Sequence, residues 1–131
     1  MLAMGRELSF FLQKESAGFF LGMDAPAGSS VACGSEVLRA VPVGTVDAAK
    51  EKHIPVVEVH GHEVKVKVGS VAHPMTPEHY IAWVCLKTRK GIQLKELPVD
   101  GAPEVTFALT ADDQVLEAYE FCNLHGVWSG K

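Results

Sequence analysis

A cysteine and a histidine lie three residues apart late in the sequence, in the stretch FCNLHGVW. A Cys122 thiolate and a His125 imidazole at this spacing can bind one metal ion together. Two ligands rarely hold a metal alone, so further ligands must come from elsewhere in the chain. Three other histidines adjoin expected strands or loops: His53 in EKHIP, and His73 and His79 at the two ends of HPMTPEH.

The number of candidate ligands bears on which metal they suit. Taken singly, each histidine is more typical of a surface or hydrogen-bonded residue than of a ligand. Mixed histidine and cysteine sites commonly hold zinc, which prefers four ligands. Five candidates in one cluster instead favour a metal that accepts a higher coordination number. The other two histidines, His60 and His62, flank Gly61 at an expected hairpin tip, where we expect exposure and no metal binding.

The segments that must position these residues have the pattern of short strands. In HEVKVKVGS, Val64, Val66 and Val68 alternate with two lysines, which is typical of a strand with one buried face. Five similar segments are separated by turn residues: IPVVEV, YIAWVCLK, IQLKELPV, EVTFALT and VLEAYEF. No segment has a long helical period, and VDAAKEKH is expected to form only a helical turn. We therefore predict an all-β fold, an antiparallel β-sandwich.

The beginning of the chain has a different composition from the rest. Over roughly the first 45 residues, Gly, Pro, Ala and Ser are scattered among short apolar pairs. This pattern predicts a small hairpin-rich appendage over residues 1–44, followed by the sandwich domain over residues 45–131.

Charge, hydropathy and cysteine usage narrow the class of protein. The net charge is −4 without a basic block, which argues against a nucleic-acid partner. No apolar run approaches the ~20 residues that span a bilayer, and the first residues lack a secretory pattern. The three scattered cysteines, Cys33, Cys85 and Cys122, are a poor disulfide framework and fit a reducing compartment. We therefore expect a cytoplasmic protein without a membrane partner, in which Cys85 is a buried packing residue.

Three segments resemble the signature sequences of superoxide reductase, the desulfoferrodoxin/neelaredoxin family. They are EKHIPVVEV, VGSVAHPMTPEHYIAWV and FCNLHGVW, and they occur in matching order from about Thr45 onward. The resemblance implies an immunoglobulin-like sandwich that holds one mononuclear non-haem iron. It also implies a ligand set of four equatorial histidines and one axial cysteine: His53, His73, His79, His125 and Cys122.

The same resemblance implies an activity and partners. A member of this family reduces superoxide to hydrogen peroxide with electrons from an external one-electron donor such as rubredoxin, and commonly forms a homodimer through its N-terminal region. Glu51 and Lys52 directly precede His53. In an arbitrary sequence this run would be a solvated charged segment. The resemblance implies that Lys52 attracts superoxide and that Glu51 occupies the sixth position of the resting ferric iron. We expect structural roles for three neighbouring residues: Pro74 and Asn123 orient ligands through backbone geometry or hydrogen bonds, and Trp128 shields the site or packs locally.

The N-terminal segment resembles a desulforedoxin-like domain that has lost its metal. Two-iron members hold a second iron there with a C-x-x-C motif and a later pair of cysteines. This sequence has Gln13 and Ser16 at the first motif, and Ala32 and Cys33 at the second. One thiol cannot form a four-thiolate site, so we expect one iron per chain. Two alternatives stay open: a non-catalytic iron-binding electron carrier and a structural zinc-binding domain.

Overall fold

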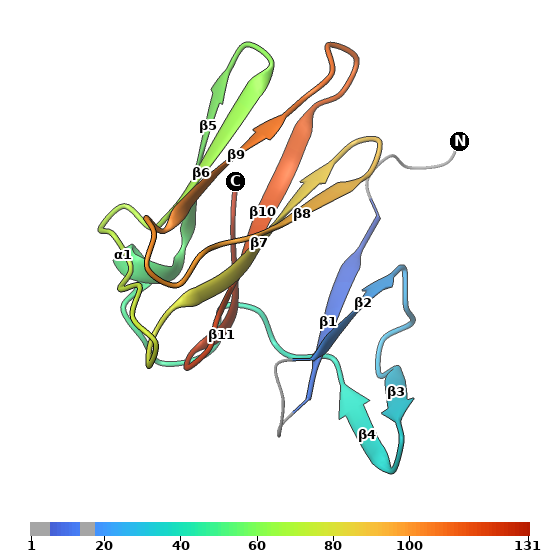
Figure 1. The fold of residues 1–131 in the computed structure, drawn as a ribbon. Coiled ribbons are helices and arrows are strands. Elements are labelled where there is room, and N and C mark those ends of the chain that lie inside the picture. The colour runs from blue at the N-terminus through green and yellow to red at the C-terminus, as the bar shows by residue number, and fades with distance from the viewer. Residues whose placement is uncertain (1–5, 14–17) are drawn as a thin grey trace. The chain divides into compact units, whose positions relative to one another are not determined.

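The computed structural model describes residues 6–13 and 18–131, and these fall into two compact units, Met1–Pro42 and Val43–Lys131. We refer to them as unit 1 and unit 2. Figure 1 shows the strands of both units coloured along the chain. Among the described residues, none belongs to a helix that is long and apolar enough to cross a membrane.

Unit 1 contains two short antiparallel hairpins. The first pairs β1 (Leu8–Leu12) with β2 (Phe19–Met23), and the second pairs β3 (Ser30–Cys33) with β4 (Glu36–Arg39). A backbone bridge between Phe11 and Ala40 connects the first hairpin to the chain that follows the second. The prediction of a hairpin-rich appendage is confirmed for the described part of this unit. Ser16 lies outside the described residues.

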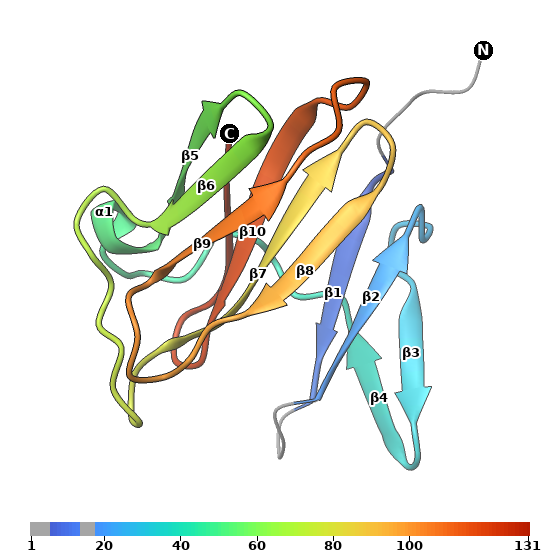
Figure 2. The same cartoon turned by 45° about the horizontal axis from the view of Figure 1, so that its top comes forward.

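Unit 2 is a sandwich of two antiparallel sheets, as Figures 1 and 2 show. One sheet has the order β5-β6-β9, formed by Pro55–His60, Glu63–Val68 and Glu104–Ala108. The other has the order β11-β10-β7-β8, formed by Gly126–Gly130, Val115–Cys122, Ile81–Thr88 and Ile92–Glu96. Seven strands divided three and four are typical of an immunoglobulin-like sandwich, so the predicted fold class is confirmed.

The core of unit 2 follows the alternation that the sequence predicted. Val64, Val66 and Val68 are fully buried on one face of β6. On the other face, Lys65 and Lys67 form ion pairs with carboxylates of the neighbouring strands, Glu104 at 3.4 Å and Glu58 at 3.0 Å. Apolar side chains of the second sheet complete the core, among them Ile81, Val84, Leu86 and Ala118.

Two features position the end of the sandwich that carries the candidate ligands. The expected helical turn is α1 (Lys50–His53), which ends directly before β5. Strand β11 was not predicted from the sequence, and it pairs with the outer edge of β10 through Cys122 and Gly126. Figure 1 shows α1, the loop after β6 and the β10–β11 turn at one end of the sandwich. The β5–β6 and β9–β10 connections lie at the opposite end.

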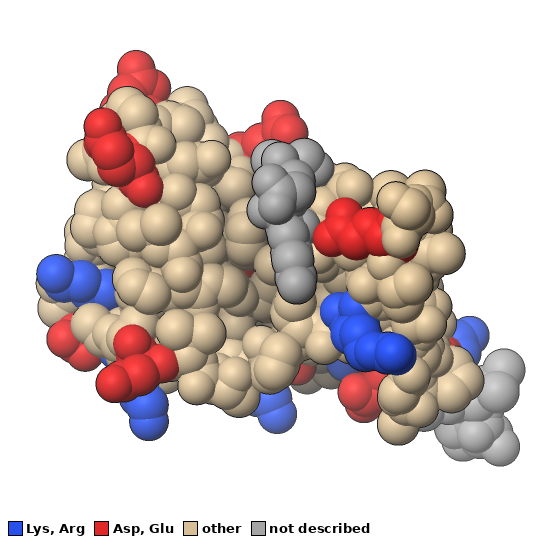
Figure 3. Space-filling model, turned by 90° about the horizontal axis from the view of Figure 1, so that it is seen from below, with Lys and Arg blue, Asp and Glu red and all other residues tan. Residues whose placement is uncertain are grey.

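Surface charge is mixed on the face drawn in Figure 3, where basic and acidic side chains form small separate groups. Neither sign forms a continuous patch on that face. This distribution agrees with the small net charge of −4.

Candidate metal centre

The helical turn α1 fixes the orientation of the His53 ring. The Nδ1 atom of His53 lies 2.7 Å from the carbonyl oxygen of Ala49, and because a carbonyl only accepts, Nδ1 carries the proton. The Nε2 atom of the neutral ring is therefore an unprotonated acceptor. The backbone of α1 is held in turn by the following loop, where the Val71 N–H donates to the Glu51 carbonyl at 2.9 Å. A Cβ at Gly69 would lie 2.7 Å from that carbonyl, so this close approach requires glycine.

The loop between β6 and β7 supplies two more rings. His73 Nδ1 lies 2.7 Å from the carbonyl oxygen of Pro74, which fixes the same tautomer as in His53. Pro74 therefore orients the ring through its backbone carbonyl. His79 follows a short turn in which its N–H donates to the Thr76 hydroxyl at 3.1 Å. Its Nε2 atom is buried and has no hydrogen-bond partner among the described residues.

The turn between β10 and β11 supplies the remaining two candidates, Cys122 and His125. Asn123 ties this turn to the loop that carries His79: it accepts a hydrogen bond from the Tyr80 N–H at 2.9 Å and donates one to the Glu78 carbonyl at 3.0 Å. Partners of this kind orient metal ligands in many proteins. The buried indole of Trp128 donates to the His125 carbonyl at 3.1 Å, and its ring lies 5.1 Å from that of His53.

The four imidazole rings stand at the corners of a square. The centroids of neighbouring rings are 4.7 Å apart for His53–His73, 4.5 Å for His73–His79, 5.1 Å for His79–His125 and 4.8 Å for His125–His53. The diagonal from His53 to His79 is longer, at 6.3 Å. Neighbouring rings are nearly perpendicular, with interplanar angles from 75° to 85°.

Ring nitrogens and a sulfur atom converge inside this square. The ligand atoms of His53, His79, Cys122 and His125 all lie within 4.8 Å of one another. His53 Nε2 lies 3.0 Å from His125 Nδ1 and 3.3 Å from His73 Nε2. The Cys122 sulfur lies 3.7 Å from His125 Nδ1. The structure thus brings together all five residues that the sequence singled out as ligands.

The donor set fits a bound cation. His53 Nε2 and His73 Nε2 are both unprotonated acceptors, so no hydrogen bond can join them across 3.3 Å. Two nitrogen ligands at right angles about a metal, each about 2.1 Å from it, lie about 3.0 Å apart. The observed separations match this spacing, and a cation would also satisfy the orphaned Nε2 of His79.

Burial favours the neutral form of three of these rings, and metal binding requires neutral imidazoles. Burial lowers the pKa of His73 to about 4, partly opposed by its hydrogen bond to Pro74. The pKa of His53 is also lowered, chiefly by burial. Burial likewise lowers the pKa of His79, and repulsion from Lys52 and from the protonated forms of His125 and His53 acts in the same direction.

The two cysteines of unit 2 differ in their surroundings. Burial raises the pKa of the Cys85 thiol to about 11, and Cys85 does not belong to the group of candidate metal ligands among the described residues. Cys85 is fully buried, as predicted for a packing residue. Burial also raises the pKa of Cys122, but the N–H groups of Leu124 and His125 oppose this shift by hydrogen bonding to the sulfur.

Glu51 and Lys52 lie on α1, next to His53. Glu51 is exposed and Lys52 is half-buried. The ammonium charge of Lys52 contributes to the lowered pKa values of both His53 and His79, so its field reaches the cluster. His60 ends β5 and His62 follows in the turn, and both are exposed, as expected.

One polar residue beside the cluster was missed by the sequence reasoning. Glu120 is fully buried, and burial raises the pKa of its carboxyl group to about 9. Its place in the sequence could have revealed it, because alternation along VLEAYEFC puts Glu120 on the same strand face as Cys122.

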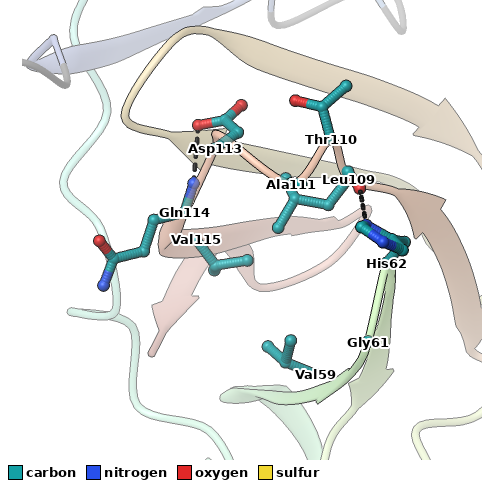
Figure 4. A pocket seen from close by; sticks show the side chains of 9 residues that line it. All are labelled: Val59, Gly61, His62, Leu109, Thr110, Ala111, Asp113, Gln114 and Val115. Atoms are coloured by element: carbon teal, nitrogen blue, oxygen red, sulfur yellow. Dashed lines mark hydrogen bonds between the residues drawn. The ribbon is translucent and has the colours of Figure 1, made fainter.

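A hollow of about 520 Å³ lies at the other end of the sandwich, between the β5–β6 turn and the β9–β10 loop (Figure 4). Its polar groups are engaged in local structure. His62 Nδ1 donates to the Leu109 carbonyl at 3.2 Å, and the Asp113 carboxylate accepts from the Thr88 hydroxyl at 2.8 Å. We therefore assign this hollow no chemical role.

Comparison with known protein families identifies the chain's relatives. A family model described as desulfoferrodoxin matches residues 45–131, and one described as the N-terminal part of class III superoxide reductase matches residues 5–41. A desulfoferrodoxin from Clostridium acetobutylicum is 37% identical over 125 residues, covering 95% of this chain and 97% of that protein. One from Nitratidesulfovibrio vulgaris is 44% identical over 110 residues, covering 83% and 84%.

Solved structures agree with this result. The superoxide reductase from Treponema pallidum is 96% identical with a TM-score of 0.90, covering 98% of this chain and 100% of that one. The superoxide reductase from Giardia intestinalis is 28% identical with a TM-score of 0.52, covering 62% and 96%. Fold and site together define a metal-binding, immunoglobulin-like β-sandwich. The chain belongs to the desulfoferrodoxin family, to which superoxide reductases belong.

Proposed function

We propose that this protein is a superoxide reductase, which converts superoxide to hydrogen peroxide at one mononuclear iron. The single observation that carries the proposal is the square of four imidazoles beside one thiol, in a chain of this family. We assign the metal to His53, His73, His79, His125 and Cys122. The overall reaction consumes one superoxide, one electron and two protons for each hydrogen peroxide formed.

The donor set supports iron over zinc. Five protein donors exceed the four that structural zinc sites use, and zinc has no redox chemistry. When bound, iron supplies the electron for superoxide by passing from the ferrous to the ferric state. Four neutral imidazoles leave the positive charge of the metal largely uncompensated, which favours approach of an anion. The Cys122 thiolate would be the fifth protein donor and would supply electron density to the iron, as the thiolate ligand does in haem-thiolate enzymes.

We assign the two charged residues of α1 to the approach of the substrate. The ammonium group of Lys52 is a local cation in an acidic protein, so it attracts superoxide toward the cluster. It also favours the negative charge that develops as superoxide is reduced. We assign to Glu51 a role in the resting ferric protein, where its carboxylate would be a further donor to the iron.

The electron must come from outside the chain. Unit 1 contains a single cysteine, Cys33, whereas a thiolate-held second iron needs four. We therefore propose an external one-electron donor such as rubredoxin, and a cytoplasmic location, where such donors and free thiols occur together. We also propose a homodimer formed through unit 1. The exposed apolar side chains of Phe20, Met23 and Val37 support this proposal.

The test combines metal analysis with turnover. We expect protein purified from its native host to contain about one iron per chain, and the reduced protein to consume superoxide with oxidation of an added one-electron donor. Hydrogen peroxide should form in equal amount to the superoxide consumed, because reduction releases no oxygen. Stoichiometric zinc would support the structural zinc alternative instead. Iron without superoxide consumption would support the electron carrier.

A further inference from the structure

A methionine lies in the middle of the loop that carries two of the candidate ligands. Met75 follows His73 by two residues and precedes His79 by four, in the segment HPMTPEH. Its side chain is half-buried and packs against the apolar core of unit 2. The metal centre described above makes no use of Met75, although its thioether is a group that an oxidant can modify.

The sulfur of Met75 ties this loop to the sandwich. The N–H of Ile81, the first residue of β7, donates a hydrogen bond to the Sδ atom of Met75 at 3.3 Å. Ile81 is fully buried, so its N–H needs a partner within the protein. A leucine would fill similar space, but it has no atom that could accept this hydrogen bond. Packing alone therefore does not account for the methionine.

The Met75 contact is one of two side-chain anchors at the start of β7. The Tyr80 N–H donates to the Asn123 side chain at 2.9 Å, and the next N–H along the chain, that of Ile81, donates to Met75. Both anchors hold the end of the loop that carries the two ligand histidines. Because Met75 lies between these histidines in the chain, a change at its sulfur is transmitted to both imidazoles through a short stretch of backbone.

We propose that Met75 is a site of oxidation by hydrogen peroxide, and that its sulfoxide loosens the ligand loop and weakens metal binding. This inference rests on the proposed function, which forms hydrogen peroxide at the metal centre. A lone pair on the Met75 sulfur attacks one peroxide oxygen, so that a sulfur–oxygen bond forms and the oxygen–oxygen bond breaks. The other oxygen leaves as water after proton transfer. The sulfur is oxidised by two electrons, and the peroxide is reduced by the same two.

The sulfoxide does not fit the place that the thioether occupies. The added oxygen is polar, whereas the Met75 side chain packs against apolar residues of the core. On the side of the sulfur that faces the Ile81 N–H, a contact of 3.3 Å leaves no room for a further atom. The oxygen is therefore either buried without a partner or accommodated by outward movement of the loop. Both outcomes destabilise the loop, so accumulated product lowers the number of metal-loaded centres.

The test uses the full-length, iron-loaded protein, with hydrogen peroxide added directly so that the outcome does not depend on turnover. Peptide mass spectrometry measures the sulfoxide at Met75, and competition with a chelator measures the affinity for iron. Thermal unfolding of the metal-free protein gives a second readout. The variants are Met75→Leu and the matched control Met23→Leu, which removes a methionine of unit 1 that is 52% exposed. Each protein is compared with itself before and after peroxide.

We expect peroxide to oxidise Met75 and to lower the iron affinity of wild type and Met23→Leu by about tenfold. The melting temperature of their metal-free forms should fall by about 5 °C. Methionine sulfoxide reductases, one for each sulfoxide epimer, should reverse both changes, because these enzymes do not reduce oxidised cysteine. Met75→Leu should show neither change.

Equal losses in Met75→Leu and wild type would overturn the inference, as would a Met75 sulfoxide that leaves the iron affinity unchanged. If Met75→Leu does not fold, reversal by the reductases decides the question, and a loss that they cannot reverse would overturn the inference. A protein that passes this test but does not consume superoxide would support the oxidation site and contradict the proposed function.

Discussion

Unit 1 and unit 2 each bring together residues that the resemblance to the family predicted at an iron site, but with different results. In unit 2, four imidazoles and one thiol converge, and two unprotonated nitrogens face each other at 3.3 Å. In unit 1, the Gln13 amide donates a hydrogen bond to the Cys33 sulfur at 3.3 Å, so these two side chains are hydrogen-bonded to each other. The first arrangement needs a cation, whereas the second is stable without one.

This difference shows what maintains each unit. The hairpins of unit 1 are held by backbone pairing, which does not depend on the side chains at positions 13 and 33. The ligand loops of unit 2 are anchored by the core of the sandwich and by Asn123. Contacts within the protein therefore hold the loops that carry the candidate ligands.

Exchanging a thiol in each unit should produce the largest contrast. We expect Cys122→Ser to abolish the sulfur-to-iron absorption and superoxide reduction while the sandwich remains folded, because serine does not supply a thiolate. Cys33→Ser should leave both properties at wild-type values. Cys85→Ser should also keep them, at a cost of about 1–3 kcal/mol in the free energy of unfolding for a hydroxyl in an apolar site. Absorption spectra and denaturant titrations check these outcomes. Loss of the iron band in Cys33→Ser would break the comparison.

Histidine protonation at acidic pH should lower the stability of unit 2 and not that of unit 1, because unit 1 contains no histidine. The pKa of His73 is about 4 in the folded protein, well below its ordinary value of 6.5. Between these two values the unfolded chain binds more protons at this site, so lowering the pH from 7 to 4 destabilises the fold. For one such group the loss is about 3 kcal/mol. The raised pKa of Glu120 has the opposite effect on stability. Below about 9 and above the ordinary value, the folded protein binds more protons at this carboxyl group than the unfolded chain does, so lowering the pH there stabilises the fold.

The measurement that isolates His73 compares two proteins. The free energy of unfolding of metal-free wild type minus that of His73→Gln should fall by about 3 kcal/mol from pH 7 to pH 4. The contribution of Glu120 is common to both proteins and cancels. A difference that stays constant with pH would show that His73 is not a neutral, buried ring.

The smallest effect concerns the rate at which superoxide arrives. We expect Lys52→Ala to slow the reaction of the reduced protein with superoxide by about three- to tenfold and to reduce its dependence on salt. Arg6→Ala in unit 1 is the control, because it removes the same charge as Lys52→Ala. Arg6 forms an ion pair with Asp24 at 2.7 Å.

Glu51→Ala should alter the ferric spectrum while the reaction rate remains close to wild type. Pulse radiolysis across a salt series checks the rates, and equal salt slopes for wild type and Lys52→Ala would exclude steering by Lys52.

Much of unit 2 could be predicted from local sequence patterns. The alternation of Val64, Val66 and Val68 predicted β6 and its buried face. The spacing of Cys122 and His125 pointed to a metal, and resemblance to a family named the other ligands. These features were accessible because each depends on residues that are close together in the chain.

Other features depend on contacts between distant segments. Strand β11 contains two glycines and a serine, and only its pairing with β10 makes it a strand. The acceptor state of His53 follows from the Ala49 carbonyl, and the order of the four rings follows from how three loops meet. Glu120 was missed because a glutamate in a strand is ordinarily read as exposed.

The separation of the ligands along the chain has a consequence for biosynthesis. His53 and His125, whose nitrogens lie 3.0 Å apart, are separated by 72 residues. A nascent chain therefore carries its first histidine ligand long before the ribosome adds the last one. The complete set of donors exists only once β10 and β11 have emerged and paired. Binding of the proposed metal would thus follow translation, and the metal available at that moment would contribute, with the ligand set, to which ion the finished protein acquires.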